Sequence, residues 1–398
     1  MTAPAPRGVR VLTFYTDLDV YRDRALMLKA AAAEVDHVTI LSSSVSEALR
    51  DELAHPNLTV ETVSARKLPR APLQALLAAK LPGRISRDAV TLVHDTQAFL
   101  LPLFAWLRLR TQRPVLLTSS FTASYVWYET LRHTHPYRSL PYLRHRWEHH
   151  LEEKAQCHLA DAVTVFGEDH RAPLAQCHGI DASKVHSLPN CADPETFRPV
   201  APDRSGLDLP PGARFLLYVG NVFRYKGAYE LLRALAVARR RFPDVHLVLL
   251  GDVHPEERAP LLAEVQALGL QGAVHFVARL PRSRVPGLLC AADALVFPSW
   301  MEGSPRAVIE AMACERPVVA TRLPGIRTLD PHERALRLCA PQDTAALAAA
   351  LEGHLASTAE ERAGRAALGR ARFLAHHTPA AAAGPLVELW RTLTQSTG

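Results

Sequence analysis

Short apolar runs alternate with longer helix-like stretches along nearly the whole chain. In the first half the runs are typical of strands, and they are VRVLTFY, HVTIL, NLTVETV, AVTLVH, PVLLTS and DAVTVFG. The pattern returns in the second half with RFLLYVG, VHLVLLG, AVHFVA, ALVFPS and RPVVAT. Strands that alternate with helices pair in parallel, so the pattern predicts two doubly wound α/β domains.

The predicted boundary between the domains lies in FRPVAPDRSGLDLPPGAR, residues 197–214. Its density of Pro, Gly and Asp can continue neither a helix nor a central strand. We therefore expect an N-terminal domain over residues 1–200 and a C-terminal domain over residues 201–375. A last amphipathic helix within residues 376–398 either ends the second domain or crosses back to the first.

Composition is ordinary for a globular protein, with 48% apolar and 22% charged residues. The chain opens without the long apolar stretch of a secretory signal, and its most apolar window, residues 98–109, is too short to cross a bilayer. We therefore expect a cytoplasmic protein. The six cysteines are far apart and predict structural thiols. The histidine-rich run RHTHPYRSLPYLRHRWEHHLEEK is interpreted as a polar helix face and not as a metal site.

Ligands bind at the carboxyl ends of strands in parallel sheets, so the loops that follow strands are the candidate site. The loop GNVFRYKG has neither the Walker spacing nor the G-x-G-x-x-G spacing, which removes the main support for ATP or nicotinamide binding. It offers Gly220 at a tight strand exit, the cation of Lys226, and Gly227 at a helix start where amides help to hold an anion.

A second half-site lies in the stretch MEGSPRAVIEAMACERPVVAT. Ser304, Pro305 and Arg306 are predicted to form the first turn of a helix, where amides favour phosphate oxygens. Glu302 precedes this turn, and Glu310 lies about two turns further on. Both carboxylates could therefore face a ligand. The alternative is that neither does, so that one glutamate caps the helix and the other lies on its solvated face.

Several motifs resemble those of retaining GT-B glycosyltransferases, in particular glycosyltransferase family 4. EGSPRAVIEAMACERPVVAT resembles the E-x7-E signature, LPNCADPETFRP the interdomain PNGVD segment, and YVGNVFRYKG the loop in which Gly-Arg is followed by Lys-Gly. VHDTQAFLLP resembles the HDWQ segment of starch and glycogen synthases. The resemblance implies a GT-B fold, in which two Rossmann-like domains face a central cleft.

By this resemblance the chain is a hexosyltransferase that is retaining and metal-independent. It would move a sugar from a nucleotide-sugar to a hydroxyl of a glycan, a lipid-linked or a small-molecule acceptor, as in cell-envelope or polysaccharide biosynthesis. The product is a nucleoside diphosphate, and no cofactor and no metal ligand are expected. The implied catalytic residues are Glu302, His94 and Asp95, and the implied donor-binding residues are Gly220, Asn221, Arg224, Lys226, Gly303, Ser304, Pro305 and Glu310.

The resemblance assigns Glu302 to the sugar hydroxyls, Glu310 to the ribose and Lys226 to the diphosphate. Ser119, Ser120 and Phe121 stand where family members commonly carry a histidine.

Asn221 replaces the usual arginine, whose charge Arg224 could supply, and Glu315 stands where glycine is usual. A GT-B sugar-nucleotide epimerase and a non-catalytic sugar-nucleotide-binding protein therefore remain alternatives.

The formal charge of +6 suits an anionic partner. Residues 64–87 carry six cations and no acid, namely Arg66, Lys67, Arg70, Lys80, Arg84 and Arg87. Leu73, Leu76, Leu77 and Leu81 share one helical face of this segment. It is either a peripheral contact with an anionic membrane or a surface helix that packs by its leucines. Nucleic acid is not expected, because no recognition motif accompanies the charge.

Overall fold

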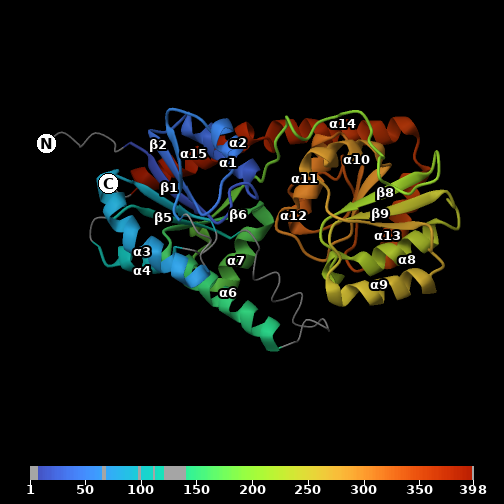
Figure 1. Ribbon diagram of the computed structural model, residues 1–398, viewed down its shortest axis with the longest axis horizontal. Coiled ribbons are helices and arrows are strands. Elements are labelled where there is room, and N and C mark those ends of the chain that lie inside the picture. The colour runs from blue at the N-terminus through green and yellow to red at the C-terminus, as the bar shows by residue number, and fades with distance from the viewer. Residues whose placement is uncertain (1–7, 65–68, 97–99, 111–112, 121–139, 397–398) are drawn as a thin grey trace. The chain divides into compact units, whose positions relative to one another are not determined.

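The computed structural model describes residues 8–64, 69–96, 100–110, 113–120 and 140–396, without the side chains of residues 140–149. The chain folds into two units (Figure 1). The first comprises Met1–Cys191 with Thr378–Gly398, and the second comprises Ala192–His377. The division therefore precedes the segment in which the sequence places the boundary, and the C-terminal helix belongs to the first unit.

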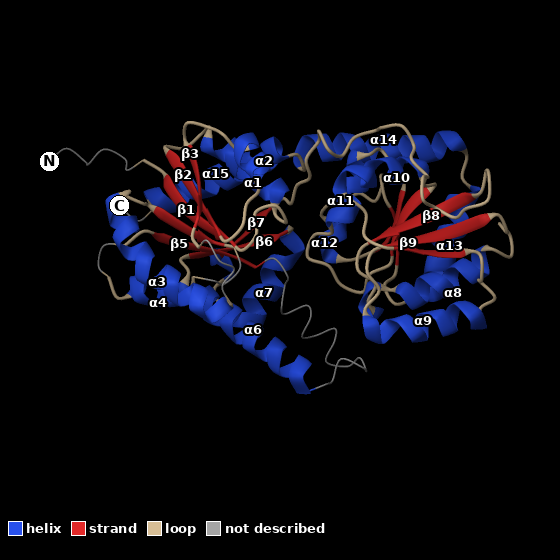
Figure 2. Cartoon of the chain, viewed as in Figure 1, coloured by secondary structure: helices blue, strands red, loops and turns tan. Residues whose placement is uncertain are grey.

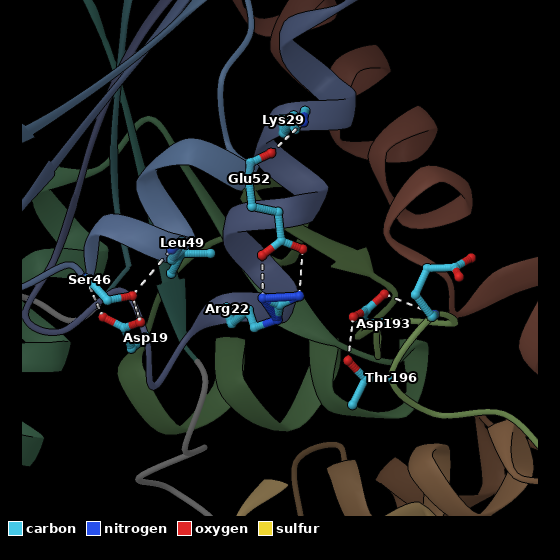
Figure 3. Close-up of polar contacts among 9 residues, drawn as sticks. Asp19, Arg22, Lys29, Ser46, Leu49, Glu52, Asp193 and Thr196 are labelled. Atoms are coloured by element: carbon cyan, nitrogen blue, oxygen red, sulfur yellow. Dashed lines mark hydrogen bonds and ion pairs between the residues drawn. The ribbon is translucent and has the colours of Figure 1, made fainter. Parts of the chain in front are cut away.

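The boundary lies at Cys191, earlier than predicted, because the residues that follow Cys191 already pack into the second unit. The Asp193 carboxylate accepts hydrogen bonds from the Glu195 amide at 3.0 Å and from the Thr196 hydroxyl at 2.6 Å (Figure 3). Asp commonly forms such turns with the backbone that follows it. This turn leads to Phe197, whose ring is buried in the core of the second unit.

Within the described residues, the first unit contains a seven-stranded parallel sheet in the order β3-β2-β1-β4-β5-β6-β7. The strands are β1 (Arg10–Tyr15), β2 (His37–Ser42), β3 (Leu58–Thr62), β4 (Leu92–Asp95), β5 (Val115–Ser120), β6 (Ala162–Phe166) and β7 (Val185–Leu188). The helices are α1 (Arg22–Ala32), α2 (Glu47–Glu52), α3 (Arg70–Arg87), α4 (Leu101–Arg108), α6 (Leu140–Leu159), η1 (Glu168–His170), α7 (Arg171–His178), η2 (Ala182–Lys184) and α15 (Pro379–Gln395). Of the strands in this sheet, all except β7 correspond to strands that the sequence predicts.

The second unit contains, in its described residues, a six-stranded parallel sheet in the order β10-β9-β8-β11-β12-β13. The strands are β8 (Arg214–Val219), β9 (Val245–Leu250), β10 (Val274–Val277), β11 (Ala294–Phe297), β12 (Val318–Thr321) and β13 (Arg337–Cys339). The helices are η3 (Arg224–Lys226), α8 (Ala228–Ala238), α9 (Pro255–Ala267), η4 (Arg282–Arg284), α10 (Val285–Ala291), α11 (Arg306–Ala313), α12 (Pro324–Arg327), α13 (Thr344–Ala356) and α14 (Ala359–His376). Here β13 is the strand that the sequence analysis missed.

Side chains of each strand alternate between two hydrophobic cores, one on each face of the sheet. In β1, Val11 and Tyr15 pack in the core that includes α1 and α15, whereas Leu12 and Phe14 pack in the core that includes α3 and α4. Helices accordingly lie on both faces of each sheet (Figure 2). Both faces are buried, so the strand ends are the part of each sheet that is open to a ligand.

The last helix, α15, is part of the first unit's core, where it packs against α1 and β7. Thr378 caps it by accepting a hydrogen bond from the Ala381 amide at 3.1 Å. Trp390 is completely buried, and its ring meets the His94 ring edge-on with centroids 6.3 Å apart. The C-terminal helix therefore supports the strand that carries His94.

Replacing Trp390 with alanine should destabilise the first unit by about 3–5 kcal/mol, because loss of a buried indole leaves a large cavity. The exposed Glu388 lies on the same helix, and Glu388→Ala is the control, with an expected cost below about 0.5 kcal/mol. Hydrogen exchange at increasing urea follows the two units separately. Amides of β1 should lose protection at lower urea in Trp390→Ala while those of β8 do not, and an equal loss in both units would contradict the assignment.

Candidate active site

Loops that follow neighbouring strands pack closely at the carboxyl edge of the second sheet. Gly251, directly after β9, has a φ of 138°, and a Cβ there would lie 2.3 Å from the Gly220 carbonyl oxygen. A Cβ at Gly227 would lie 2.0 Å from the Pro298 carbonyl oxygen after β11. Glycine at these two positions lets the loops after β8, β9 and β11 pack backbone against backbone.

Lys226 and Glu302 form an ion pair at this edge. Lys226 ends η3, immediately before Gly227, which is the N-cap of α8. Lys226 Nζ contacts Glu302 Oε1, and the two side chains are only 21% and 13% exposed. The ammonium also lies over the rings of Tyr225 and Phe297, at 5.3 and 5.9 Å from their centroids. A cation that is largely withdrawn from water is thus held by a carboxylate and two aromatic rings.

Hydrogen bonds fix the loop that carries Glu302. The Ser299 hydroxyl donates to the Met301 carbonyl at 2.9 Å. The Trp300 amide donates to the Tyr225 carbonyl at 2.8 Å, which joins the loop after β11 to η3. One network therefore positions both the carboxylate and the ammonium.

The helix after this loop begins later than the sequence predicts. Pro305 is the N-cap of α11 in an extended conformation, and the first helical residue is Arg306, so Ser304 and Pro305 are not in the first turn. Gly303 is packed against α12, because a Cβ at Gly325 would lie 1.9 Å from the Gly303 carbonyl oxygen. The three residues before α11 thus form a tight turn between the paired carboxylate and the helix.

Glu310 lies in α11 and is only 8% exposed, which excludes a solvated helix face. Its Oε1 lies 3.6 Å from Arg282 Nη1 in an ion pair. The Arg282 guanidinium in turn lies over the Phe197 ring, 4.6 Å from the centroid. The sequence analysis did not identify Arg282. The available signal was the basic stretch PRSR that follows β10.

Asn221 follows Gly220 in the loop after β8. Its carbonyl accepts a hydrogen bond from the Tyr218 hydroxyl at 2.9 Å. Burial, and then the nearby Glu302 and Tyr225, raises the pKa of Tyr218 well above its usual value. The phenol therefore stays protonated and serves as a fixed donor to this loop.

Arg224 lies in η3 with Lys226 but contacts a different group. Its guanidinium lies 4.5 Å from the centroid of the Tyr229 ring. The Tyr229 hydroxyl donates to the Glu257 carboxylate at 2.6 Å. Lys226 is therefore the cation of this loop that the structure places against Glu302.

His94 ends β4 in the first unit together with Asp95, and both are buried. His94 Nε2 lies 2.8 Å from Ser119 Oγ, which lies 2.6 Å from Thr164 Oγ1. Burial, and then the charge of Arg24, lowers the pKa of His94 to about 3. The imidazole is therefore neutral at neutral pH.

Asp95 stabilises the start of α4. Its Oδ2 accepts hydrogen bonds from the Leu100 amide at 2.6 Å and from Gln156 Nε2 at 2.9 Å. His94 and Asp95 thus each have partners within the first unit, and a role for either at a sugar stays a prediction.

The Asp-Leu-Asp stretch at residues 17–19 shapes its own loop after β1 and connects it to the loop after β2. Asp17 Oδ1 accepts a hydrogen bond from the Asp19 amide at 3.1 Å. The Asp19 carboxylate accepts from the Ser46 amide at 2.8 Å and from the Ser46 hydroxyl at 2.5 Å (Figure 3). Ser46 caps α2 by accepting from the Leu49 amide at 3.2 Å. These contacts give both aspartates a structural function.

The structure shows the local environment of two residues that depart from the family motifs, Glu315 and Ser120. Glu315 follows α11 with a φ of 54°, in the left-handed region that glycine adopts with least strain. Ser120 ends β5 and donates a hydrogen bond to Glu153. Phe121 lies outside the described residues.

Three of the four leucines on the predicted face of the basic segment pack into the protein, and Leu76 is half-buried. Leu73, Leu77 and Leu81 of α3 are buried in a core of the first unit. Arg66 and Lys67 lie outside the described residues. Contact with an anionic membrane therefore stays a prediction that rests on charge alone. No helix in the described part of the chain combines the length and the apolarity needed to cross a membrane.

Two family models match successive parts of the chain. The model described as Glycosyltransferase Family 4 matches residues 24–196, and the model described as Glycosyl transferases group 1 matches residues 213–357. Among curated proteins, D-inositol 3-phosphate glycosyltransferase 2 from Catenulispora acidiphila is 32% identical over 205 residues, which make up 49% of this chain and 48% of that protein. The chain thus spans about half the length of this relative.

Solved structures resemble this chain over nearly its whole length. Sucrose-phosphate synthase from Thermosynechococcus elongatus has a TM-score of 0.76 at 23% identity, and the match covers 97% of this chain and 99% of that one. Anabaena HepE in complex with UDP and glucose has a TM-score of 0.69 at 19% identity, with 96% and 99% covered. These likenesses and the two parallel sheets identify the fold as GT-B. Because the two family models match in succession along a chain of this fold, the chain belongs to the group 1 glycosyltransferases of family 4.

Proposed function

We propose that this chain transfers a sugar from a nucleoside-diphosphate sugar to an acceptor hydroxyl, with retention of configuration and without a bound metal ion. The ion pair of Lys226 and Glu302 carries the proposal, together with the buried Glu310 on the adjoining helix. The donor presents a diphosphate directly beside a sugar. An ammonium in contact with a carboxylate matches these neighbouring groups, and the family membership agrees with this use.

The first donor to test is a UDP-hexose. Anabaena HepE, which shares the fold, has been solved with UDP and with UDP-glucose. The curated relative is a D-inositol 3-phosphate glycosyltransferase, so a phosphorylated polyol is the first acceptor to test. A formal charge of +6 favours the approach of such an anion.

The arrangement of the side chains suggests how the donor is oriented. A diphosphate that meets Lys226 brings the attached sugar to Glu302, because the two side chains are in contact. Glu302 would then accept hydrogen bonds from the sugar hydroxyls, and Glu310 from the ribose. Positive charge develops at the anomeric carbon in the transition state, so a carboxylate beside the sugar acts more strongly there than in the bound ground state.

In the proposed reaction the bond between the anomeric carbon and the diphosphate oxygen breaks. The acceptor oxygen forms a new bond on the same face of the sugar, and its proton passes to the leaving diphosphate. Lys226 stabilises the negative charge that grows on that group. No protein nucleophile is required, which fits Ser119 and Ser120 at the position where relatives commonly carry a histidine.

Substituting the two glutamates should affect different quantities, namely the rate of transfer for Glu302 and the affinity for UDP for Glu310. Glu302→Gln should lower the rate of transfer far more than the affinity for UDP, because its contact strengthens in the transition state. Glu310→Gln should weaken UDP binding by about 1.5–3 kcal/mol, the range for a hydrogen bond to a charged group. Isothermal titration with UDP, beside turnover of a UDP-hexose, measures both effects.

The matched control for these variants is Glu315→Gln, at the end of the same helix, which should leave both quantities unchanged. Turnover of the donor without an acceptor would indicate the epimerase. UDP binding without any turnover would indicate a non-catalytic protein. If both active-site variants bind and react like the parent, the carboxylates have no role in the reaction.

Lys226→Ala should weaken UDP binding by about 1.5–3 kcal/mol and leave uridine binding unchanged, because the ammonium acts on the diphosphate alone. Saturation-transfer NMR for uridine and calorimetry for UDP make the comparison. Lys80→Ala, on the exposed face of α3, controls for a general loss of positive charge. An equal loss of affinity for uridine and for UDP would show that Lys226 only supports the fold of the loop.

UDP should bind with the same affinity in the presence of EDTA and in the presence of Mg²⁺. In the proposed function Lys226 neutralises the diphosphate charge, and the Asp17 and Asp19 carboxylates already accept hydrogen bonds from the loops after β1 and β2. Calorimetry under the two conditions decides the matter. Binding that depends on Mg²⁺ would overturn the metal-free mechanism.

A further inference from the structure

Three potential metal ligands converge in the first unit, and none of them belongs to the proposed donor site. His150 lies on α6, and Cys177 and His178 end α7. One ligand atom from each residue lies within 4.8 Å of the other two. The two imidazole centroids are 5.1 Å apart. Helices α6 and α7, both green in Figure 1, therefore meet through these side chains.

The surroundings of His178 point to a ligand. Its side chain is completely buried, and neither ring nitrogen has a hydrogen-bond partner. Leaving a buried polar group unsatisfied costs about 1–3 kcal/mol, so such groups in native proteins usually have a partner. Glu153 Oε2 lies 3.5 Å from His178 Nε2, which is too long for a good hydrogen bond. A cation between these side chains would satisfy the imidazole.

The backbone at the end of α7 holds the paired ligands in place. Gly179 has a φ of 67° and ends the helix in the left-handed conformation, directly after Cys177 and His178. The His178 carbonyl oxygen lies 2.9 Å from His158 Nε2, which joins the end of α7 to α6. Both helices are therefore fixed at the point where their ligands meet.

We propose that His150, Cys177 and His178 bind a zinc ion, with Glu153 as the fourth ligand. Two imidazoles, a thiolate and a carboxylate form a donor set that zinc accepts. The thiolate and the carboxylate together neutralise the dication. Zinc–ligand bonds of about 2.0–2.3 Å in a tetrahedron place ligand atoms roughly 3.4 Å apart, so binding would draw atoms that now lie within 4.8 Å of one another together by at most about 1.4 Å.

The proposed ion would connect three elements of the first unit. It joins α6 to the end of α7, and Glu153 accepts a hydrogen bond from Ser120 at the end of β5. His150 belongs to the histidine-rich run that the sequence analysis interprets as a polar face, yet it meets residues of another helix. The proposed ion therefore has a structural role, which is to hold these elements together, and it takes no part in the transfer reaction.

The test uses the tag-free full chain, stripped with a chelator and titrated with Zn²⁺ against a chromophoric indicator. The parent should bind one tight equivalent, and zinc should raise its thermal unfolding temperature. His150→Gln and Cys177→Ala should weaken binding at least about 100-fold, because loss of a supporting residue alone costs 10- to 100-fold. Cys157→Ala on α6 and His186→Gln on β7 are the matched controls and should bind like the parent.

Co²⁺ gives a second readout that does not depend on the stability of any variant. A thiolate-to-cobalt charge-transfer band in the parent, absent in Cys177→Ala and present in Cys157→Ala, would support the site. A parent that binds no zinc at micromolar concentration, or that shows no thiolate band with cobalt, would overturn the proposal. Unchanged affinity in both ligand variants would overturn it as well, whatever the outcome of the UDP experiments.

Discussion

The contact between Lys226 and Glu302 is the interaction on which the proposed active site depends. It joins a loop after β8 to a loop after β11, two strands that are far apart in sequence but paired in the sheet. Removing two charges from water costs free energy, and here the carboxylate and two aromatic rings offset the cost for the ammonium. In the proposed function this charge pair, largely withdrawn from water at the end of a parallel sheet, meets the diphosphate and the sugar of the donor.

Neighbouring residues of the second unit hold this contact in place. Glycine at positions 227 and 251 allows backbones to approach at distances that a side chain would prevent. Hydrogen bonds from Ser299 to the Met301 carbonyl and from Trp300 to the Tyr225 carbonyl then fix the loop that carries Glu302. The protein makes these contacts by itself, without a donor, and such preorganisation is what the proposed electrostatic stabilisation of a leaving group requires.

Most strands of both sheets could be predicted from the sequence, because central strands of parallel sheets are continuous apolar runs. The missed strands, β7 and β13, are short edge strands with few apolar residues, so they give little pattern. The motifs located Lys226 and Glu302, and the structure adds that they touch. The start of α11 was predicted too early because Pro305 caps the helix in an extended conformation.

Arg282 and the cluster around His178 could not be predicted, since each depends on side chains from separate elements that only the fold brings together. For the same reason the sequence could not show that His94 and Asp95 have hydrogen-bond partners inside the first unit.

The most direct test of the central claim is a double-mutant cycle on the rate of sugar transfer, with Lys226→Met, Glu302→Gln and the double variant. If the pair acts as one unit on the donor, the two losses should be non-additive by at least about 1 kcal/mol, as for residues in direct contact. Losses that add, within about 0.3–0.5 kcal/mol, would mean that the two side chains act independently and would contradict the account.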